Sequence, residues 1–406
     1  MGLLNKKTRT PAQVVVEDVV KIKKGERVLI VANPDTAEIA QDLYSASSEA
    51  GALATLMYQP DKTSFDNANP EVLAAIASEP EVCFSISNIK LGKDPGATAN
   101  PYTTEDGQKF THIFDYLLDG KKTMRGAWTP GITADMMNRT AAIDYKQLQE
   151  RCAKLTEIFK GAVSVHVTAP AGTNLVIPIN GRGLLADDGD FSKPGTGGNI
   201  PAGEVFISPV VGGSTLKAAD GSPLEQQSDG CEGTIVYDGS MTFSDGDSIL
   251  ETPITCKVEK GYVTDITGGA EARRLLKTIA EAELRPFALE KEGKLPKGQA
   301  EIYKKNARNI GELGIGLNPA ANITGNMLED EKAFHTCHFA IGENYDNDAP
   351  SLIHLDGVVR EPTIVLTYGD GSSRTILMNG VLQLENYTNC VRKTIVISRK
   401  SHFVVL

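Results

Sequence analysis

The sequence has few of the features that mark membrane, secreted or nucleic-acid-binding proteins. No apolar run approaches the ~20 residues of a membrane helix, and the first residues, MGLLNKKTRTPAQ, contain neither an apolar signal core nor a cleavage site. A basic cluster is also missing: 52 acidic residues outnumber 41 basic ones, for a formal charge of −11. We therefore expect a cytoplasmic protein whose partners include neither nucleic acid nor a membrane.

Disulfide, structural-zinc and dinucleotide motifs are absent as well. The sequence has no CxxC pair, and no second ligand pair completes the small cluster of His335, Cys337 and His338 into a structural zinc site. The turn after the first expected strand, ANPDTAE, lacks a glycine-rich phosphate fingerprint, so we expect no dinucleotide cofactor. Scattered spacing favours reduced, mostly buried thiols at the six cysteines, which are Cys83, Cys152, Cys231, Cys256, Cys337 and Cys390.

What the first 160 residues do contain is an alternation of helices and short apolar strands. Helical spacing over residues 13–24 is followed by the apolar run ERVLIVANP. Further helices are expected over 36–50 and 70–78, and strands over 52–58 and 81–87. This alternation predicts a parallel sheet with crossover helices.

The pattern changes after an amphipathic helix expected over residues 143–161. Strand-like segments such as AVSVHVTA, TNLVIPING and GTIVYDGSMTF follow, separated by Gly, Asp and Pro turns, and another helix is expected over 270–289. The predicted fold class is α/β, with an N-terminal parallel-sheet scaffold domain (1–160) and a C-terminal mixed α+β domain (161–406) that carries a metal site. A chain of 406 residues is long enough for both domains.

Residue types that bind metals gather between Glu312 and Asp356. In LIHLD, the period of two of a strand places His354 and Asp356 on one face, from which both can reach one ion. Because the segment has no Arg or Lys beside it, a buried Asp356 would be an uncompensated charge without a cation. Alternatively, His354 and Asp356 hydrogen-bond each other at a strand end. Glu312 in GELGIGLNP and His338 in HFAIGENY favour the metal interpretation.

Glu204 extends this set from a distant part of the chain. It follows a glycine- and proline-rich loop and comes directly before Val205, Phe206 and Ile207, where burial is expected. A solvated Glu204 would leave that position unexplained. We expect its carboxylate to point into the same cleft as Glu312.

Four motifs in this order, NIPAGEVFISP, GELGIGLNP, HFAIGENY and SLIHLD, resemble the thermophilic metallo-aminopeptidase family that includes aminopeptidases T and S. The resemblance covers most of residues 160 to 370. It implies a homodimer that acts on a peptide or small molecule through two divalent ions (Zn, Co or Mn). The ligand positions that it implies are Glu204, Glu312, His338, His354 and Asp356.

In such a peptidase, two ions share a water whose pKa they lower toward neutrality, and one ion polarises the scissile carbonyl. Glu312 is the expected bridge between the ions. Tyr345 falls where the family carries a tyrosine that assists the tetrahedral intermediate, and Glu331 is a candidate for either coordination shell. The resemblance therefore predicts a metallo-aminopeptidase with Glu312 and Tyr345 as its catalytic residues.

Another resemblance shares the fold but implies different chemistry. CEGTIVYDG, VEKGYVTDITGGAEA and the strand with His354 and Asp356 are similar to the ring-cleaving dihydroxypyridine dioxygenase family, which binds one Fe(II) through two histidines and one carboxylate. That family's other histidine corresponds to Glu312, and an apolar residue stands in place of Glu204. Both glutamates favour two hard divalent ions and hydrolysis. A third interpretation is a metal-binding protein without peptidase activity.

Overall fold

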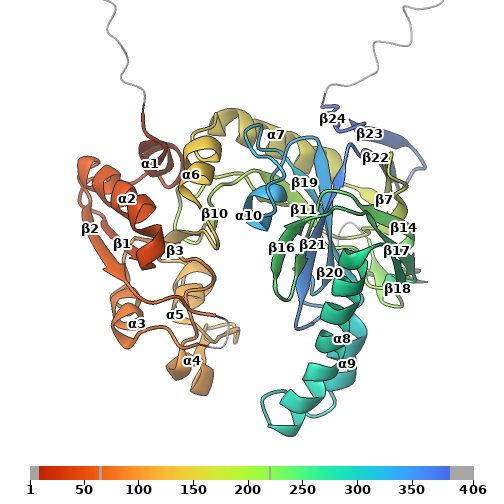
Figure 1. Ribbon diagram of the computed structural model, residues 1–406, viewed down its shortest axis with the longest axis horizontal. Coiled ribbons are helices and arrows are strands. Elements are labelled where there is room, and N and C mark those ends of the chain that lie inside the picture. The colour runs from red at the N-terminus through yellow and green to blue at the C-terminus, as the bar shows by residue number, and fades with distance from the viewer. Residues whose placement is uncertain (1–8, 64–65, 219–220, 385–406) are drawn as a thin grey trace, which may run out of the picture.

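The computed structural model describes residues 9–63, 66–218 and 221–384 (Figure 1). One parallel sheet lies in the N-terminal part and two large antiparallel sheets lie in the C-terminal part, with α7 (Tyr145–Phe159) between them at the top of the view (Figure 1). The predicted fold class is confirmed: an N-terminal parallel sheet with crossover helices precedes a C-terminal mixed α+β region.

The N-terminal sheet is parallel throughout because helices return the chain to the same edge between strands. Its central strands have the apolar runs VLIVA and VCFSI, which suit strands covered on both faces. In spatial order its strands are β10 (Gly197–Asn199), β6 (Arg125–Trp128), β3 (Val82–Ile86), β1 (Arg27–Ala32) and β2 (Leu53–Tyr58). Since β10 comes from beyond residue 160, the sheet includes part of the second predicted domain, and the boundary at 160 stays a prediction.

Helices cover this sheet and lead out of it. In α7, the Asp144 side chain accepts a hydrogen bond from the Gln147 amide, and Leu148, Cys152 and Leu155 form the buried face at helical spacing. The longer helices are α2 (Ala37–Glu49), α3 (Pro70–Ala77), α6 (Ala134–Thr140) and α7. Shorter elements are α1 (Pro11–Val14), η1 (Val15–Val19), η2 (Pro34–Thr36), α4 (Pro95–Ala99), β4 (Tyr102–Thr103), β5 (Lys109–Phe110), α5 (Ile113–Asp115) and η3 (Tyr116–Gly120).

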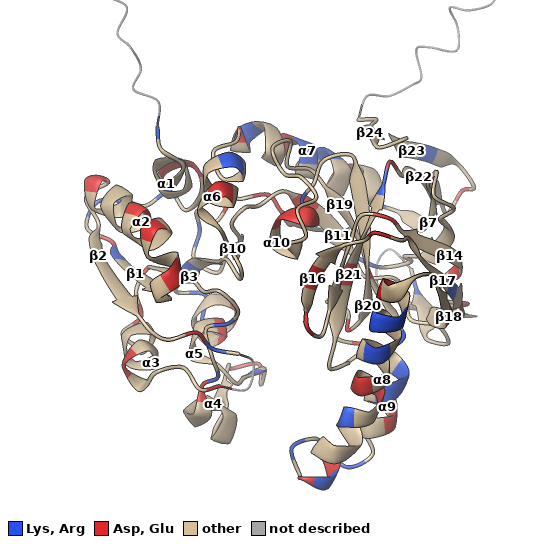
Figure 2. Cartoon of the chain, viewed as in Figure 1, with Lys and Arg blue, Asp and Glu red and all other residues tan. Residues whose placement is uncertain are grey.

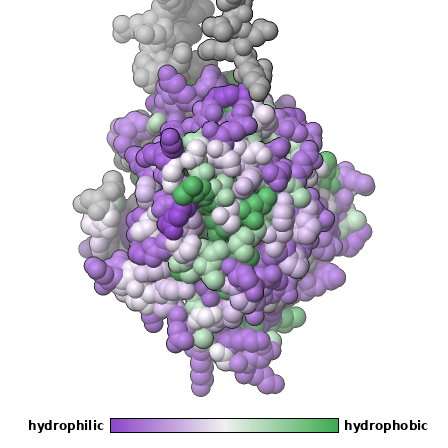
Figure 3. Space-filling view, turned by 90° about the vertical axis from the view of Figure 1, so that its left-hand side faces the viewer, coloured by the Kyte–Doolittle hydropathy of each residue, from purple (hydrophilic) through white to green (hydrophobic). Residues whose placement is uncertain are grey.

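Strand β2 is an edge strand that leaves apolar side chains in solvent. Leu53 is 64% exposed and Tyr58 is 45% exposed, whereas the neighbouring strand β1 is almost entirely buried. Figure 3 shows apolar surface gathered on the side of the molecule where β2 lies.

A seven-stranded antiparallel sheet carries the candidate site. Strands β19 and β20 are buried at every position, which explains their near-continuous small and apolar sequences IGELGIG and TCHFAIG. In spatial order its strands are β16 (Gly246–Ile249), β15 (Ser240–Phe243), β21 (His354–Arg360), β20 (Thr336–Gly342), β19 (Ile310–Gly316), β11 (Glu204–Ile207) and β9 (Leu185–Asp187).

An eight-stranded antiparallel sheet contributes to the same hydrophobic core. Its strands are β18 (Tyr262–Thr267), β17 (Ile254–Glu259), β14 (Glu232–Tyr237), β8 (Asn174–Pro178), β7 (Ala162–Thr168), β22 (Thr363–Tyr368), β23 (Ser373–Met378) and β24 (Val381–Leu382). Ile235 of β14 and Phe339 of β20 are both fully buried members of that core. The remaining elements are β12 (Thr215–Lys217), β13 (Pro223–Gln227), α8 (Ala270–Lys291), α9 (Ala300–Asn306) and α10 (Met327–Asp330).

Three further features bear on the expectations from composition. Figure 2 shows basic and acidic residues interleaved along α8 and α9. Within the described ranges, no helix is both long enough and apolar enough to cross a membrane. The five cysteines at 83, 152, 231, 256 and 337 are free and buried, as expected, while Cys390 lies outside the described residues.

Candidate metal centre

Adjacent strands of the seven-stranded sheet bring the predicted ligands together. Glu204 begins β11, Glu312 lies in β19, His338 in β20, and His354 and Asp356 in β21. The alternation along β21 places His354 and Asp356 on one face, as predicted from LIHLD. A Cβ atom added at Gly314 would lie 2.0 Å from His338 Nε2, so the imidazole occupies space that only a glycine leaves open.

Glu312 lies between the two imidazoles. Its Oε1 is 3.1 Å from His338 Nε2, and its Oε2 is 3.1 Å from His354 Nε2. His354 Nε2 is also 3.4 Å from Asp356 Oδ1. These donor separations match the edges of a coordination shell with metal–ligand bonds of roughly 2.0–2.2 Å. Glu312, His354 and Asp356 thus form one candidate group for a cation.

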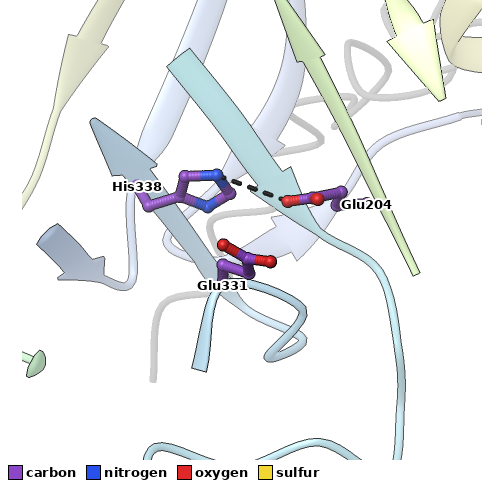
Figure 4. Close-up of side chains that lie close together, drawn as sticks. All are labelled: Glu204, Glu331 and His338. Atoms are coloured by element: carbon purple, nitrogen blue, oxygen red, sulfur yellow. Dashed lines mark ion pairs between the residues drawn. The ribbon is translucent and has the colours of Figure 1, made fainter. Parts of the chain in front are cut away.

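A second candidate group lies on the other side of Glu312. It consists of Glu204, Glu331 and His338 (Figure 4), and Glu204 Oε2 is 3.3 Å from His338 Nε2. Glu331 follows α10 and approaches from outside the sheet, in agreement with its predicted place near the metal site. The structure therefore brings all five predicted ligands, and Glu331, into one buried cluster.

Besides Asp187, Lys332 is a residue of this cluster that the sequence analysis missed. Its side chain is completely buried, and its Nζ lies 2.7 Å from Glu204 Oε1, 3.8 Å from Asp187 Oδ2 and in short contact with Glu331 Oε1. When all three carboxyl groups are ionised, they outnumber the one ammonium and leave an excess of negative charge that a divalent cation would balance. The signal available in the sequence was the charged run EDEK, which is followed, after three residues, by the buried strand β20.

Hydrogen bonding in the cluster fits a bound cation. His354 Nδ1 lies 2.8 Å from the Glu343 carbonyl, so Nδ1 carries a proton and donates it, and Nε2 can bind a metal once its own proton has left. Glu204 Oε2 and Asp356 Oδ1 are buried and form no hydrogen bond of good geometry with the described residues, and each faces an imidazole nitrogen, at 3.3 Å and 3.4 Å respectively. Buried carboxylate oxygens rarely stay unpartnered, and a metal ion satisfies them.

The protonation states follow from these contacts. Burial opposes the charge of Glu312, but hydrogen bonds from His338 and His354 outweigh burial and lower its pKa to about 2. Burial also opposes a charged His338, but its hydrogen bond to Glu312 and the charge of Glu204 raise its pKa to about 9. Against burial, Asp356 and Glu312 raise the pKa of His354 as well. A cation that binds here must therefore displace protons from both imidazoles.

These shifts predict that the metal-free chain is less stable at pH 9 than at pH 6.5. The pKa of His338 rises from its ordinary 6.5 to about 9 in the folded chain, so its stabilising contribution is complete below pH 6.5 and is lost as pH rises through 9. Burial raises the pKa of Glu331 from its ordinary 4.5 to about 8, so the unfolded chain ionises this carboxyl first and the fold loses stability as pH rises toward 8. Calorimetry in chelator should show a lower Tm at pH 9, and excess divalent cation should reduce the difference. Equal Tm values in chelator would contradict this account.

Tyr345 lies at the rim of the cluster. Its ring is 5.3 Å from the His354 ring, nearly perpendicular to it, and 4.8 Å from the Phe206 ring. The residue is 52% exposed, and its amide donates to Ser208 Oγ at 3.2 Å. Tyr345 thus lies beside His354, and the catalytic role expected from the sequence stays a prediction.

Comparison with known proteins bears on the two chemistries that the sequence resemblances imply, peptide hydrolysis and oxidative ring cleavage. The family model of 2,5-dihydroxypyridine 5,6-dioxygenase (NicX) matches residues 133–380. The chain belongs to this dioxygenase family. Residues 133–380 include Glu204, Glu331 and all the ligand candidates of β19, β20 and β21.

Individual comparisons, all at low identity, include both a dioxygenase and AmpT. The 2,5-dihydroxypyridine 5,6-dioxygenase of Pseudomonas putida is 26% identical over 220 residues, and the match spans about half of each protein, 52% of this chain and 52% of the relative. The solved structure of that bacterium's enzyme matches with a TM-score of 0.62 at 16% identity, covering 92% of this chain and 96% of the other. The AmpT structure from Thermus thermophilus matches with a TM-score of 0.60 at 15% identity, covering 92% and 98%.

The expectation of a metallo-aminopeptidase was wrong. The family match and the curated dioxygenase relative contradict that expectation, so the terms hydrolase, protease and aminopeptidase are withdrawn. The physical reason is that both kinds of enzyme share this fold at nearly equal TM-scores. Motifs around strand-borne carboxylates and imidazoles identify the scaffold and its metal chemistry, and they do not distinguish hydrolysis from ring opening.

Proposed function

We propose that this chain is a non-haem Fe(II) dioxygenase that opens a hydroxylated nitrogen-containing aromatic ring of the dihydroxypyridine type. The observation that carries the proposal is the family match over residues 133–380, which spans the whole candidate metal centre. The sequence match to the dioxygenase relative covers only about half of that protein, so activity and substrate belong to the proposal and not to the family assignment.

Glu312, His354 and Asp356 would hold the ferrous ion. One imidazole and two carboxylates are suitable donors for Fe(II), although the related dioxygenases are expected to use two histidines and one carboxylate. When bound, a ferrous ion supplies the one-electron chemistry that lets O2 react with an aromatic ring. The additional carboxylate at Glu312 places more negative charge at this centre than a histidine would.

The residues around the centre would bind and orient the ring. His354 is fixed by its hydrogen bond to the Glu343 carbonyl. Phe206 and Tyr345 form an aromatic pair beside it, and the exposed Tyr345 ring offers a face to a planar substrate. The phenol of Tyr345 can donate a hydrogen bond to a ring oxygen.

Three expectations from the sequence stay proposals. A small-molecule substrate follows from the dioxygenase assignment, and a homodimer and a second divalent ion per chain remain open to measurement. The group of Glu204, Glu331 and His338 supports the second ion because its three ligand atoms all lie within 4.8 Å of one another. Sedimentation equilibrium would measure the number of chains in the particle, and metal titration would measure the number of ions bound per chain.

Oxygen consumption tests the proposed function. The chain loaded anaerobically with Fe(II) should consume about one O2 for each 2,5-dihydroxypyridine that loses its ring absorbance, because a dioxygenase places both oxygen atoms in the product. Zn(II)-loaded protein is the control and should consume none, since Zn(II) has no redox chemistry. Metal binding without oxygen uptake would overturn the proposal and support the interpretation of a metal-binding protein without catalysis.

A further inference from the structure

A cavity of about 600 Å³ lies in the N-terminal part of the chain, apart from the metal centre. Its lining residues all fall between Ser85 and Pro130, and none of them is a candidate metal ligand. The cavity opens where β3 and β6 end, with Ser85, Ser87 and Thr129 at its inner wall. Open parallel sheets bind ligands at this edge, and the volume lies within the usual range of about 300–1,000 Å³ for small-molecule sites.

Aromatic rings form part of the cavity wall. Trp128, the only tryptophan of the chain, meets Phe114 edge-to-face, with centroids 6.1 Å apart and planes at 86°. Leu91 and Leu118 add apolar surface. Such walls favour a flat ring over a flexible aliphatic molecule, because a ring can continue the stacked and edge-to-face contacts.

His112 offers the cavity region an unused hydrogen-bond donor. Its Nδ1 accepts from the Phe114 amide at 3.0 Å, since His112 caps α5, and the proton of the neutral ring therefore lies on Nε2. Nε2 is buried and has no hydrogen-bond partner among the described residues. A buried donor without a partner costs stability, so an acceptor oxygen supplied by a ligand would complete it.

The charges around the cavity argue against an anion. Two lysines, Lys90 and Lys93, line it together with three carboxylates, Asp94, Asp115 and Asp119. Asp94 is committed to the backbone, accepting from the amides of Ala97 and Ile113. The excess of negative charge selects a neutral ligand over a carboxylate.

We propose that this cavity is a second binding site, specific for a neutral planar aromatic molecule that carries a hydroxyl or oxo group. The ring packs against Trp128 and Phe114, and its oxygen accepts from His112 Nε2. The site does not use the metal ligands, so its occupation does not depend on the proposed ring-opening activity.

Phenol is the probe, measured by Trp128 fluorescence and by calorimetry on the full chain. It should bind with and without metal, and equally well in a His354→Ala variant. Benzoate should bind more weakly because of its charge, and cyclohexanol because it lacks an aromatic ring. Absence of a signal at millimolar phenol, or binding that requires metal or His354, would overturn the proposal.

Variants locate the ligand. His112→Asn keeps a side-chain oxygen to cap α5 but removes Nε2, and it should weaken phenol binding about tenfold, the effect of one hydrogen bond. Trp128→Leu, followed by calorimetry, should weaken binding as well. His166→Asn, at an exposed histidine of β7, is the matched control and should bind like the unmodified chain. Unchanged affinity in His112→Asn would overturn the assignment. If the chain opens the ring of 2,5-dihydroxypyridine but does not bind phenol in this cavity, the second site is wrong and the proposed function stands. If it binds phenol but does not open the ring, the proposed function is wrong and the second site stands.

Discussion

Glu312→Gln is expected to lower metal affinity by at least about 100-fold, because changing a residue that only orients a metal ligand already costs 10–100-fold. Both oxygens of Glu312 lie 3.1 Å from an imidazole nitrogen, Oε1 from His338 and Oε2 from His354. A glutamine would place a donating NH2 group at one of these positions and remove the negative charge. Oxygen uptake with 2,5-dihydroxypyridine should fall at least in proportion to the lost metal.

Competition with a chelating dye would measure metal affinity in this variant, and an oxygen electrode would measure turnover. Glu301→Gln is the matched control, since Glu301 is an exposed residue in the first turn of α9 and should leave both quantities unchanged. Full metal content in Glu312→Gln would remove Glu312 from the ligand set. Lost activity with retained metal would instead assign Glu312 to substrate handling.

Lys332→Met is expected to destabilise the metal-free chain by about 3–5 kcal/mol, the usual cost of removing one partner from a buried ion pair. Methionine approximates the length of the lysine stem but leaves Asp187, Glu204 and Glu331 without their shared ammonium. Burial already raises the pKa of Asp187 to about 8 although Lys332 opposes the shift. Denaturant unfolding followed by circular dichroism would measure the loss.

Two comparisons make this result specific to charge. Adding Glu204→Gln to Lys332→Met should recover part of the lost stability, because one uncompensated carboxylate is removed. Lys146→Met, at an exposed position of α7, should change the free energy of unfolding by less than about 0.5 kcal/mol. If Lys332→Met unfolds at the same denaturant concentration as the unmodified chain, Lys332 does not balance the cluster.

The correction from aminopeptidase to dioxygenase shows what a ligand set can decide. The presence of Glu204 and Glu312 favoured hydrolysis because carboxylates suit hard divalent ions. The structure brings these residues together with His338, His354 and Asp356, and their role as metal ligands stays a prediction. The chemistry depends in addition on the metal and on the substrate cavity, which residue types on strands do not specify.

Local sequence patterns determined much of the fold and of the cluster. Helices alternating with buried strands required a parallel sheet in the first half, and the period of two in LIHLD placed His354 and Asp356 on one face. These patterns act over a few residues, where the geometry of helix and strand alone decides which side chains point the same way.

Tertiary structure alone decided the contacts between distant segments. Lys332 meets Glu204, 128 residues earlier in the chain, and the cavity of the N-terminal part forms where β3 and β6 end beside α5. Such neighbours depend on the order of strands in a sheet and on where helices return to it. That order comes from the packing of the whole core, so no short stretch of the sequence contains it.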